Sequence, residues 1–157
     1  MPDDIQNLRR ILHECRVIAV VGLSANWNRP SYFAAKYMMQ HGYSIVPVNP
    51  AYQEVLGQRC YASLREAAEK CELKIDMVDC FRKTAEILPI AEDAIAIGAK
   101  VLWQQIGVLN HEAGEKASAA GLDTIMDRCV KIEHGRLFGG LNWCGVNTGV
   151  ISAKRPH

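Results

Sequence analysis

Short apolar runs alternate with amphipathic segments along most of the 157-residue chain. The first run, residues 17–21, is Val-Ile-Ala-Val-Val and ends at a glycine. Continuous β-branched runs of this length are typical of strands that are buried on both faces. Strands are predicted on this basis over residues 17–21, 43–48, 75–80, 100–104 and 122–126.

The segments between the apolar runs carry helix signals. Apolar residues recur at helical spacing in residues 4–15, ahead of the first predicted strand. Ser31 stands where an N-cap belongs, and residues 51–61 have the composition of a connecting loop. Further helices are predicted over residues 31–41, 64–70, 84–97 and 110–120. Pro89 is expected to divide the helix over residues 84–97.

Repeated alternation of strand and helix predicts an α/β fold. The expected architecture is a Rossmann-like doubly wound parallel sheet of about five strands with helices on both faces, because each βα unit buries its strand in that way. The expected strand order is 3-2-1-4-5. Ligands of such sheets bind beyond the carboxyl ends of the strands, near the point where strand order reverses. The residues after each strand are therefore the candidate site.

The loop after the first strand, residues 22–31, could hold phosphate groups on its backbone N–H groups and on the helix start behind it. It matches the dinucleotide fingerprint poorly, because Ser24 and Trp27 occupy its second and third glycine positions. The second strand ends at Asn49 rather than at the acidic residue that usually holds an NAD ribose. A conventional NAD dehydrogenase is disfavoured.

Two arginines follow predicted strands at the ligand edge. Arg29 lies in the first loop and Arg82 follows the third strand. A guanidinium group makes paired hydrogen bonds to phosphate oxygens, so these residues suit a phosphorylated ligand, although an isolated arginine is often only a solvated surface residue.

An ordered set of motifs lies between residues 5 and 137. The motifs are Val20-Val21-Gly22-Leu23-Ser24, Arg29-Pro30-Ser31-Tyr32, Val46-Pro47-Val48-Asn49-Pro50, Val78-Asp79-Cys80-Phe81-Arg82, residues 94–100, residues 103–108 and Met126-Asp127-Arg128-Cys129. Taken together, they resemble the small CoA-binding proteins, a family related to the N-terminal CoA-binding domain of the succinyl-CoA synthetase α subunit.

The resemblance implies that coenzyme A lies across the carboxyl ends of the strands. It places Gly22, Ser24, Arg29 and Ser31 at the CoA phosphates. It also implies adenosine-side contacts from Val48 and Pro50, a further wall from Phe81 and Arg82, and a pantetheine path near Gln105 and Gly107.

The resemblance also sets the expected domain organisation. Residues 1–137 are expected to form the CoA-binding Rossmann-like domain, and residues 138–157 a C-terminal extension packed on the same domain. The extension holds four glycines and Trp143. It could add a hairpin or edge strand to the domain, cover part of the ligand mouth or form a contact in a homodimer, and a structural role is favoured over ligand contact.

Bulk composition excludes several other classes. A formal net charge of +1 does not indicate nucleic-acid binding, and no apolar run approaches the length of a membrane span. The acidic start and six dispersed cysteines without a Cys-x-x-Cys pair predict a cytoplasmic protein with reduced thiols. The five histidines show no ligand spacing, so no metal is expected.

No catalytic residue is predicted. Ser24 faintly resembles a nucleophile elbow, but Asn26 stands where the elbow requires glycine. Asp79 and Asp127 end strands and could be buried carboxylates, yet such aspartates commonly accept backbone hydrogen bonds. Cys80 and Cys129 could approach a CoA thiol and form a mixed disulfide.

The chain is therefore interpreted as a binding protein for CoA or an acyl-CoA. Two alternatives stay open at this point: an NAD(P)-binding oxidoreductase or redox-sensing domain, and a subunit that lends its CoA site to a separate acyl-CoA ligase.

Overall fold

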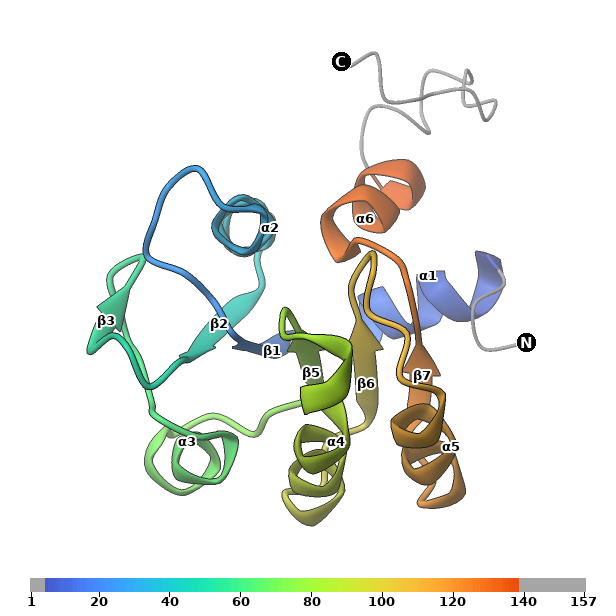
Figure 1. Ribbon diagram of the computed structural model, residues 1–157. Coiled ribbons are helices and arrows are strands. Elements are labelled where there is room, and N and C mark those ends of the chain that lie inside the picture. The colour runs from blue at the N-terminus through green and yellow to red at the C-terminus, as the bar shows by residue number, and fades with distance from the viewer. Residues whose placement is uncertain (1–4, 139–157) are drawn as a thin grey trace.

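The computed structural model describes residues 5–138, which fold around one parallel sheet. In spatial order the sheet runs β2-β1-β5-β6-β7 (Figure 1). Every neighbouring pair is parallel. The strands are β1 (Val17–Val21), β2 (Ser44–Val48), β5 (Met77–Cys80), β6 (Val101–Gln104) and β7 (Asp123–Ile125).

Helices of the described residues 5–138 cover both faces of this sheet (Figure 1). On one face, Leu8, Ala34 and Val130 belong to one buried apolar cluster. On the other, Leu64 and Ala91 belong to a second cluster. The helices of the first face are α1 (Ile5–Glu14), α2 (Pro30–Gln40) and α6 (Val130–Phe138), and those of the second face are α3 (Leu64–Lys70), α4 (Ile87–Ala96) and α5 (His111–Ala119). The predicted fold class is confirmed.

The predicted strand order is wrong in one respect. In chain order the five sheet strands lie 2-1-3-4-5, with β5 beside β1, rather than 3-2-1-4-5. Pro47 explains why β2 takes the edge, since proline has no N–H for a central ladder and is confined to edge positions. Tyr61 covers the outer side of β2, where its N–H donates to the Pro47 carbonyl at 3.0 Å. The order therefore reverses between β1 and β5.

Residues 54–59 form a hairpin within the segment 51–61 that was predicted to be a connecting loop. Strands β3 (Glu54–Val55) and β4 (Gln58–Arg59) pair antiparallel through a two-residue turn. Leu56 and Gly57 both have positive φ, 55° and 75°, as a type I′ hairpin turn requires.

Helix starts also differ from the prediction. Arg29, rather than Ser31, is the N-cap residue of α2, and Pro30 opens the helix. Ser31 instead accepts a hydrogen bond on its hydroxyl oxygen from the Ser24 N–H at 3.0 Å. Thr84 begins a short 3-10 turn, Thr84–Glu86, that precedes α4. Helix α6 had no counterpart among the predicted helices.

Within residues 5–138, none of the helices combines the length and apolar character needed to cross a membrane. The predicted C-terminal extension, apart from Phe138 at the end of α6, lies outside the described residues.

Candidate functional site

The site forms where the loops after β1 and β5 meet at the carboxyl edge of the sheet. Gly22 has φ of +91°, and a Cβ at that position would lie 2.5 Å from the Phe81 carbonyl oxygen. Only glycine can therefore follow β1 without moving the β5 loop. The Gly22 N–H also donates to the Val48 carbonyl at 2.8 Å, so the ends of β2, β1 and β5 are held together.

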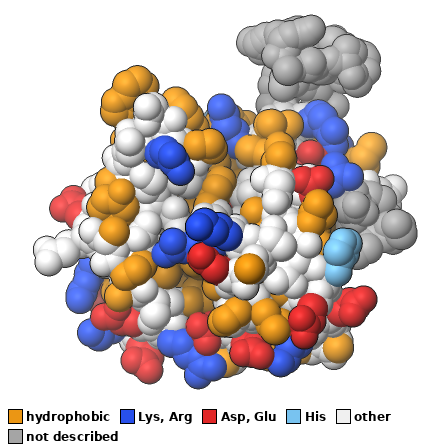
Figure 2. Space-filling view, in the orientation of Figure 1, with side chains coloured by type: hydrophobic (Ala, Val, Ile, Leu, Met, Phe, Trp, Pro, Cys, Tyr) orange, Lys and Arg blue, Asp and Glu red, His pale blue; other side chains and the backbone are white. Residues whose placement is uncertain are grey.

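A cavity of about 550 Å³ opens on the α2 and α6 side of this contact. Hydrophobic side chains gather in the middle of the face shown in Figure 2, with Lys and Arg side chains beside them. The lining combines the first loop and the start of α2 with the β6–α5 loop and the start of α6. Its residues are Gly22, Ser24, Arg29, Pro30, Ser31, Phe81, Gln105, Ile106, Val108, Cys129 and Ile132.

A second cavity of about 320 Å³ lies at the same edge, between β2, α3 and the start of α4. Most of its lining residues are apolar, and one is an arginine. Its lining residues are Val21, Val48, Pro50, Ala62, Ser63, Leu64, Arg82, Glu86 and Ile90.

These two cavities divide the ten residues predicted as the ligand site. Gly22, Ser24, Arg29, Ser31, Phe81 and Gln105 line the larger cavity. Val48, Pro50 and Arg82 line the smaller one. Gly107 lines neither cavity. It has φ of +86°, and its N–H donates to Asp127 Oδ1 at 2.7 Å.

Local hydrogen bonds fix the shape of the first loop. The Ser24 hydroxyl oxygen accepts from the Asn26 N–H at 3.0 Å. Asn49, at the end of β2, donates from Nδ2 to the Leu23 carbonyl at 3.1 Å and accepts from the Ala51 N–H at 2.9 Å. The Asn49 side chain therefore holds the loop in place, and a ribose-binding role for it has no support in this geometry.

The two predicted arginines stand on opposite sides of the Gly22–Phe81 contact. Arg29 is exposed at the start of α2, where the positive end of the helix dipole adds to its charge. Arg82 is partly buried, and its Nε lies 4.0 Å from Glu86 Oε1, a loose ion pair. Both guanidinium groups can thus take up an anionic ligand without breaking a tight internal ion pair.

A buried carboxyl group lies beneath the larger cavity. Gln105 Nε2 donates to Asp79 Oδ1, and Gln105 Oε1 accepts from the Val130 N–H at 3.3 Å. Asp79 is 1% exposed, and burial raises its pKa to about 7, although the hydrogen bond from Gln105 acts in the opposite direction. The Gln105 amide thus connects Asp79 on β5 to the first turn of α6.

A catalytic arrangement around Ser24 is absent from the described part of the chain. Ser24 Oγ lies 3.5 Å from Tyr52 Oη, and no histidine hydrogen-bonds to it within residues 5–138. His134 Nδ1 instead shares a hydrogen bond with Tyr37 Oη at 3.0 Å. Burial lowers the pKa of His134 to about 4, which favours the neutral imidazole.

One wall of the larger cavity is absent from the ten predicted ligand residues, although the sequence had indicated Cys129 as a cysteine that could approach a CoA thiol. Cys129 and Ile132 reach it from the start of α6, while Ile106 and Val108 come from the loop after β6. The exposed fraction of the Ile106 side chain is 62%, unusual for isoleucine. Apolar residues beside the predicted Gln105 were the available signal for that loop, whereas nothing in the sequence pattern had placed α6 over the site.

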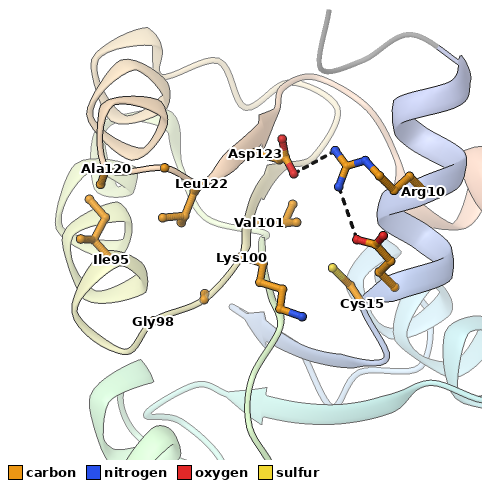
Figure 3. A pocket seen from close by; sticks show the side chains of 12 residues that line it. Arg10, Cys15, Ile95, Gly98, Lys100, Val101, Ala120, Leu122 and Asp123 are labelled. Carbon is orange, nitrogen blue, oxygen red and sulfur yellow. Dashed lines mark hydrogen bonds and ion pairs between the residues drawn. The ribbon is translucent and has the colours of Figure 1, made fainter.

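A third cavity, of about 370 Å³, lies at the opposite, amino edge of the sheet (Figure 3). Its charged side chains are mostly paired with one another. Arg10 bonds Asp123 at 3.1 Å and Glu14 at 3.4 Å, with Lys100 and Cys15 nearby (Figure 3). None of the predicted ligand residues lines it. Residues 5–138 contain no group of three or more His, Cys, Asp or Glu side chains that could hold a metal ion.

Comparison with known proteins identifies the class of this domain. The model of the CoA binding domain family matches residues 16–135, which is well over half of the chain. The chain therefore belongs to the CoA binding domain family.

Individual relatives agree with this assignment. The YneT protein of Bacillus subtilis (strain 168) is 38% identical over 127 residues, which cover 81% of this chain and 91% of that protein. A solved protein of Pyrococcus horikoshii OT3 is 41% identical with a TM-score of 0.82, covering 87% of this chain and 93% of its own.

A larger enzyme contains the same fold. An acetyl-coenzyme A synthetase of Ca. Korarchaeum cryptofilum matches 69% of this chain with a TM-score of 0.58 and 20% identity. The match covers 25% of the synthetase chain. At this identity the likeness establishes the shared fold alone.

Proposed function

We propose that this protein binds coenzyme A, free or acylated, across the two cavities of the carboxyl edge, and that it has no catalytic chemistry of its own. The observation that carries the proposal is the pair of cavities on either side of the Gly22–Phe81 contact, each with one arginine, in a chain of the CoA binding domain family. CoA is long and bears phosphate groups in its middle region, so a ligand of this kind suits two adjoining cavities.

The chemistry of the larger cavity supports a phosphate contact at the first loop. Ser24, Arg29 and the start of α2 bring together a hydroxyl group, a guanidinium group and a helix N-terminus. These groups stabilise phosphate by hydrogen bonds and by charge. The apolar wall of Ile106 and Val108 then suits the less polar pantetheine arm.

The smaller cavity suits the adenosine end. Val48 and Pro50 offer apolar surface, and Arg82 offers a positive charge within the same wall. An adenine ring gains stability from apolar contact, and a guanidinium group can hydrogen-bond a nearby phosphate.

Binding of NAD(P) has less support than binding of CoA. The ribose contact of an NAD site requires an acceptor at the end of β2, and the Asn49 side chain there is already hydrogen-bonded to Leu23 and Ala51. The second candidate, a subunit that lends its CoA site to a separate ligase, rests on the occurrence of the same fold as a quarter of an acetyl-coenzyme A synthetase chain.

Calorimetric titration of the protein with CoA, acetyl-CoA, NAD and NADP tests the proposal. We expect saturable binding of CoA or acetyl-CoA with one site per chain, and much weaker binding of both dinucleotides. Binding of NAD without binding of either CoA form would overturn the proposal. Co-purification of a ligase-like partner with a tagged chain would favour the subunit role over independent binding.

A further inference from the structure

The larger cavity holds a thiol group that a binding function does not require. Cys129 lines the cavity beside Gln105 and Ile132 and is partly exposed. Cys80, the last residue of β5, is completely buried and lines neither carboxyl-edge cavity.

The position of Cys129 follows from the way the chain enters α6. The Trp103 indole donates to the Arg128 carbonyl at 2.8 Å, and the Arg128 N–H donates to the Gln104 carbonyl at 3.3 Å. The Val130 N–H is held by Gln105. Residues on both sides of Cys129 are therefore fixed to β6 and to the loop after it, which keeps its side chain at the cavity wall.

The lining of the cavity comes from two parts of the chain. Ser24 and Arg29 belong to the first loop, whereas Ile106 and Val108 belong to the loop after β6 and Cys129 lies just before α6. A CoA molecule whose phosphates contact the first loop would direct its pantetheine arm, and hence its sulfur, along the apolar wall toward Cys129.

We propose that this site also captures CoA disulfides covalently, with the Cys129 thiol forming a mixed disulfide with CoA. The inference rests on the proposed CoA-binding function and goes beyond it, because it makes binding covalent and reversible by thiols.

The exchange needs no oxidant other than the disulfide itself. The Cys129 thiol loses its proton to solvent, and the thiolate attacks the CoA sulfur of a disulfide CoA–S–S–R. A bond forms between Cys129 Sγ and the CoA sulfur while the original S–S bond breaks. The leaving thiolate RS⁻ departs with the electron pair and takes a proton from water. Free thiol reverses the reaction by the same route.

The surroundings of Cys129 set the rate of this exchange. Burial raises the pKa of the Cys129 thiol, and the nearby Asp79 carboxylate raises it further, while backbone hydrogen bonds from Ile132 and Lys131 lower it. The thiolate fraction at neutral pH is therefore small, and reactivity depends on the bound position of the disulfide. We expect slow exchange at pH 7 that accelerates as the pH rises.

Intact-mass measurement after incubation with oxidised CoA, the symmetrical disulfide, tests the inference. Oxidised glutathione at the same concentration serves as the reagent control. We expect one CoA adduct per chain, mapped by peptide digestion to Cys129, removed by reductant, and formed on the order of tenfold faster than the glutathione adduct. The rate should saturate with the concentration of oxidised CoA. Dephospho analogues of CoA that lack the thiol group should compete only weakly with oxidised CoA for the site.

Two matched variants distinguish exchange at Cys129 from non-specific reaction of other exposed thiols with the disulfide reagent. Cys129→Ser should abolish the adduct, and its circular dichroism spectrum and unfolding midpoint should match those of the parent, which shows that the variant is folded. Cys71→Ser removes another partly exposed thiol, one that donates to the Leu73 carbonyl outside both cavities, and should leave the rate unchanged.

The outcomes distinguish two kinds of failure. CoA binding without an adduct, or an adduct on any cysteine other than Cys129, overturns the covalent step and leaves the proposed function in place. Absence of CoA binding in the parent protein overturns the proposed function itself. Equal rates for oxidised CoA and oxidised glutathione contradict a role for the site in the exchange.

Discussion

The amino and carboxyl edges of the same sheet both contain a cavity with charged residues and a cysteine. The two edges differ in whether their arginine side chains already form close ion pairs within the protein. At the amino edge, Arg10 is already bonded to Asp123 and Glu14 (Figure 3). At the carboxyl edge, Arg29 is exposed at a helix start, and Arg82 is 4.0 Å from its acidic neighbour.

This difference shows which cavity is suited to an anionic ligand. A ligand at the amino edge would have to compete with internal ion pairs. A ligand at the carboxyl edge gains charge-assisted hydrogen bonds and a helix dipole with little internal competition. Cavity volume alone does not reveal this, because the amino-edge cavity, at about 370 Å³, is larger than the smaller carboxyl-edge cavity, at about 320 Å³.

The largest difference between the edges should be the loss of stability when a glycine at each edge is replaced by alanine. Gly22→Ala places a Cβ against the Phe81 carbonyl at a positive φ, so we expect a loss of roughly 3–5 kcal/mol in the free energy of unfolding and loss of CoA binding. Gly121→Ala at the amino edge shares a positive φ but has no atom within 4 Å of the new Cβ, so about 1 kcal/mol is expected. Chemical denaturation of both variants measures the contrast, and equal losses would contradict it.

The second-largest effect should be a pH dependence of the free energy of unfolding, caused by Asp79, the buried acid beneath the larger cavity. Because burial raises the pKa of Asp79 to about 7, the folded protein retains this proton between about pH 4 and pH 7 while the unfolded chain loses it. The free energy of unfolding contributed by this group therefore falls as the pH rises through that window. Asp79→Asn removes the titration, so its stability relative to the parent should rise by about 2–4 kcal/mol from pH 4.5 to pH 8.

Urea unfolding at several pH values measures this dependence. Asp123→Asn is the control from the amino edge, where the carboxylate is partly exposed and paired with Arg10. We expect its stability difference to stay within about 1 kcal/mol across the same range. A flat difference for Asp79→Asn would show that Asp79 is charged in the folded protein throughout.

The third contrast concerns ligand affinity. Arg29→Ala should weaken CoA binding by about 1.5–3 kcal/mol through loss of a charge-assisted contact, with little change in stability, since the side chain is exposed. Arg10→Ala at the amino edge should leave CoA affinity unchanged. Calorimetric titration of both variants decides this, and a larger loss for Arg10→Ala would place the ligand at the other edge.

The smallest expected effect concerns Arg82 and its acidic neighbour. Arg82→Ala should reduce CoA affinity by about 1 kcal/mol, less than Arg29→Ala, because Glu86 competes for the same guanidinium group. Glu86→Gln removes that competition and should strengthen binding by a few tenths of a kcal/mol. Weaker binding by Glu86→Gln would indicate that Glu86 itself contacts the ligand.

The sequence alone was enough to predict the layers of the fold and most of the residues of the first loop that line the larger cavity. The β-branched runs ending at Gly22 and Asn49 specify buried parallel strands, and this local pattern survives because such strands are covered on both faces. The strand order was mispredicted although Pro47 carried a signal, since a proline without an N–H favours an edge strand. The family resemblance, rather than the residue pattern, was what selected coenzyme A among phosphorylated ligands.

Only the tertiary structure decided how the site residues are shared between two cavities and which further residues complete them. Arg29 and Arg82 follow strands in the same way, yet the Gly22–Phe81 contact places them in different cavities. Cys129 lies just before α6, where the Arg128 carbonyl accepts from the Trp103 indole of β6 and the Val130 N–H donates to Gln105 in the loop after β6. Sequence periodicity reports which face of an element is buried, whereas the meeting of separate loops depends on long-range packing that no local pattern encodes.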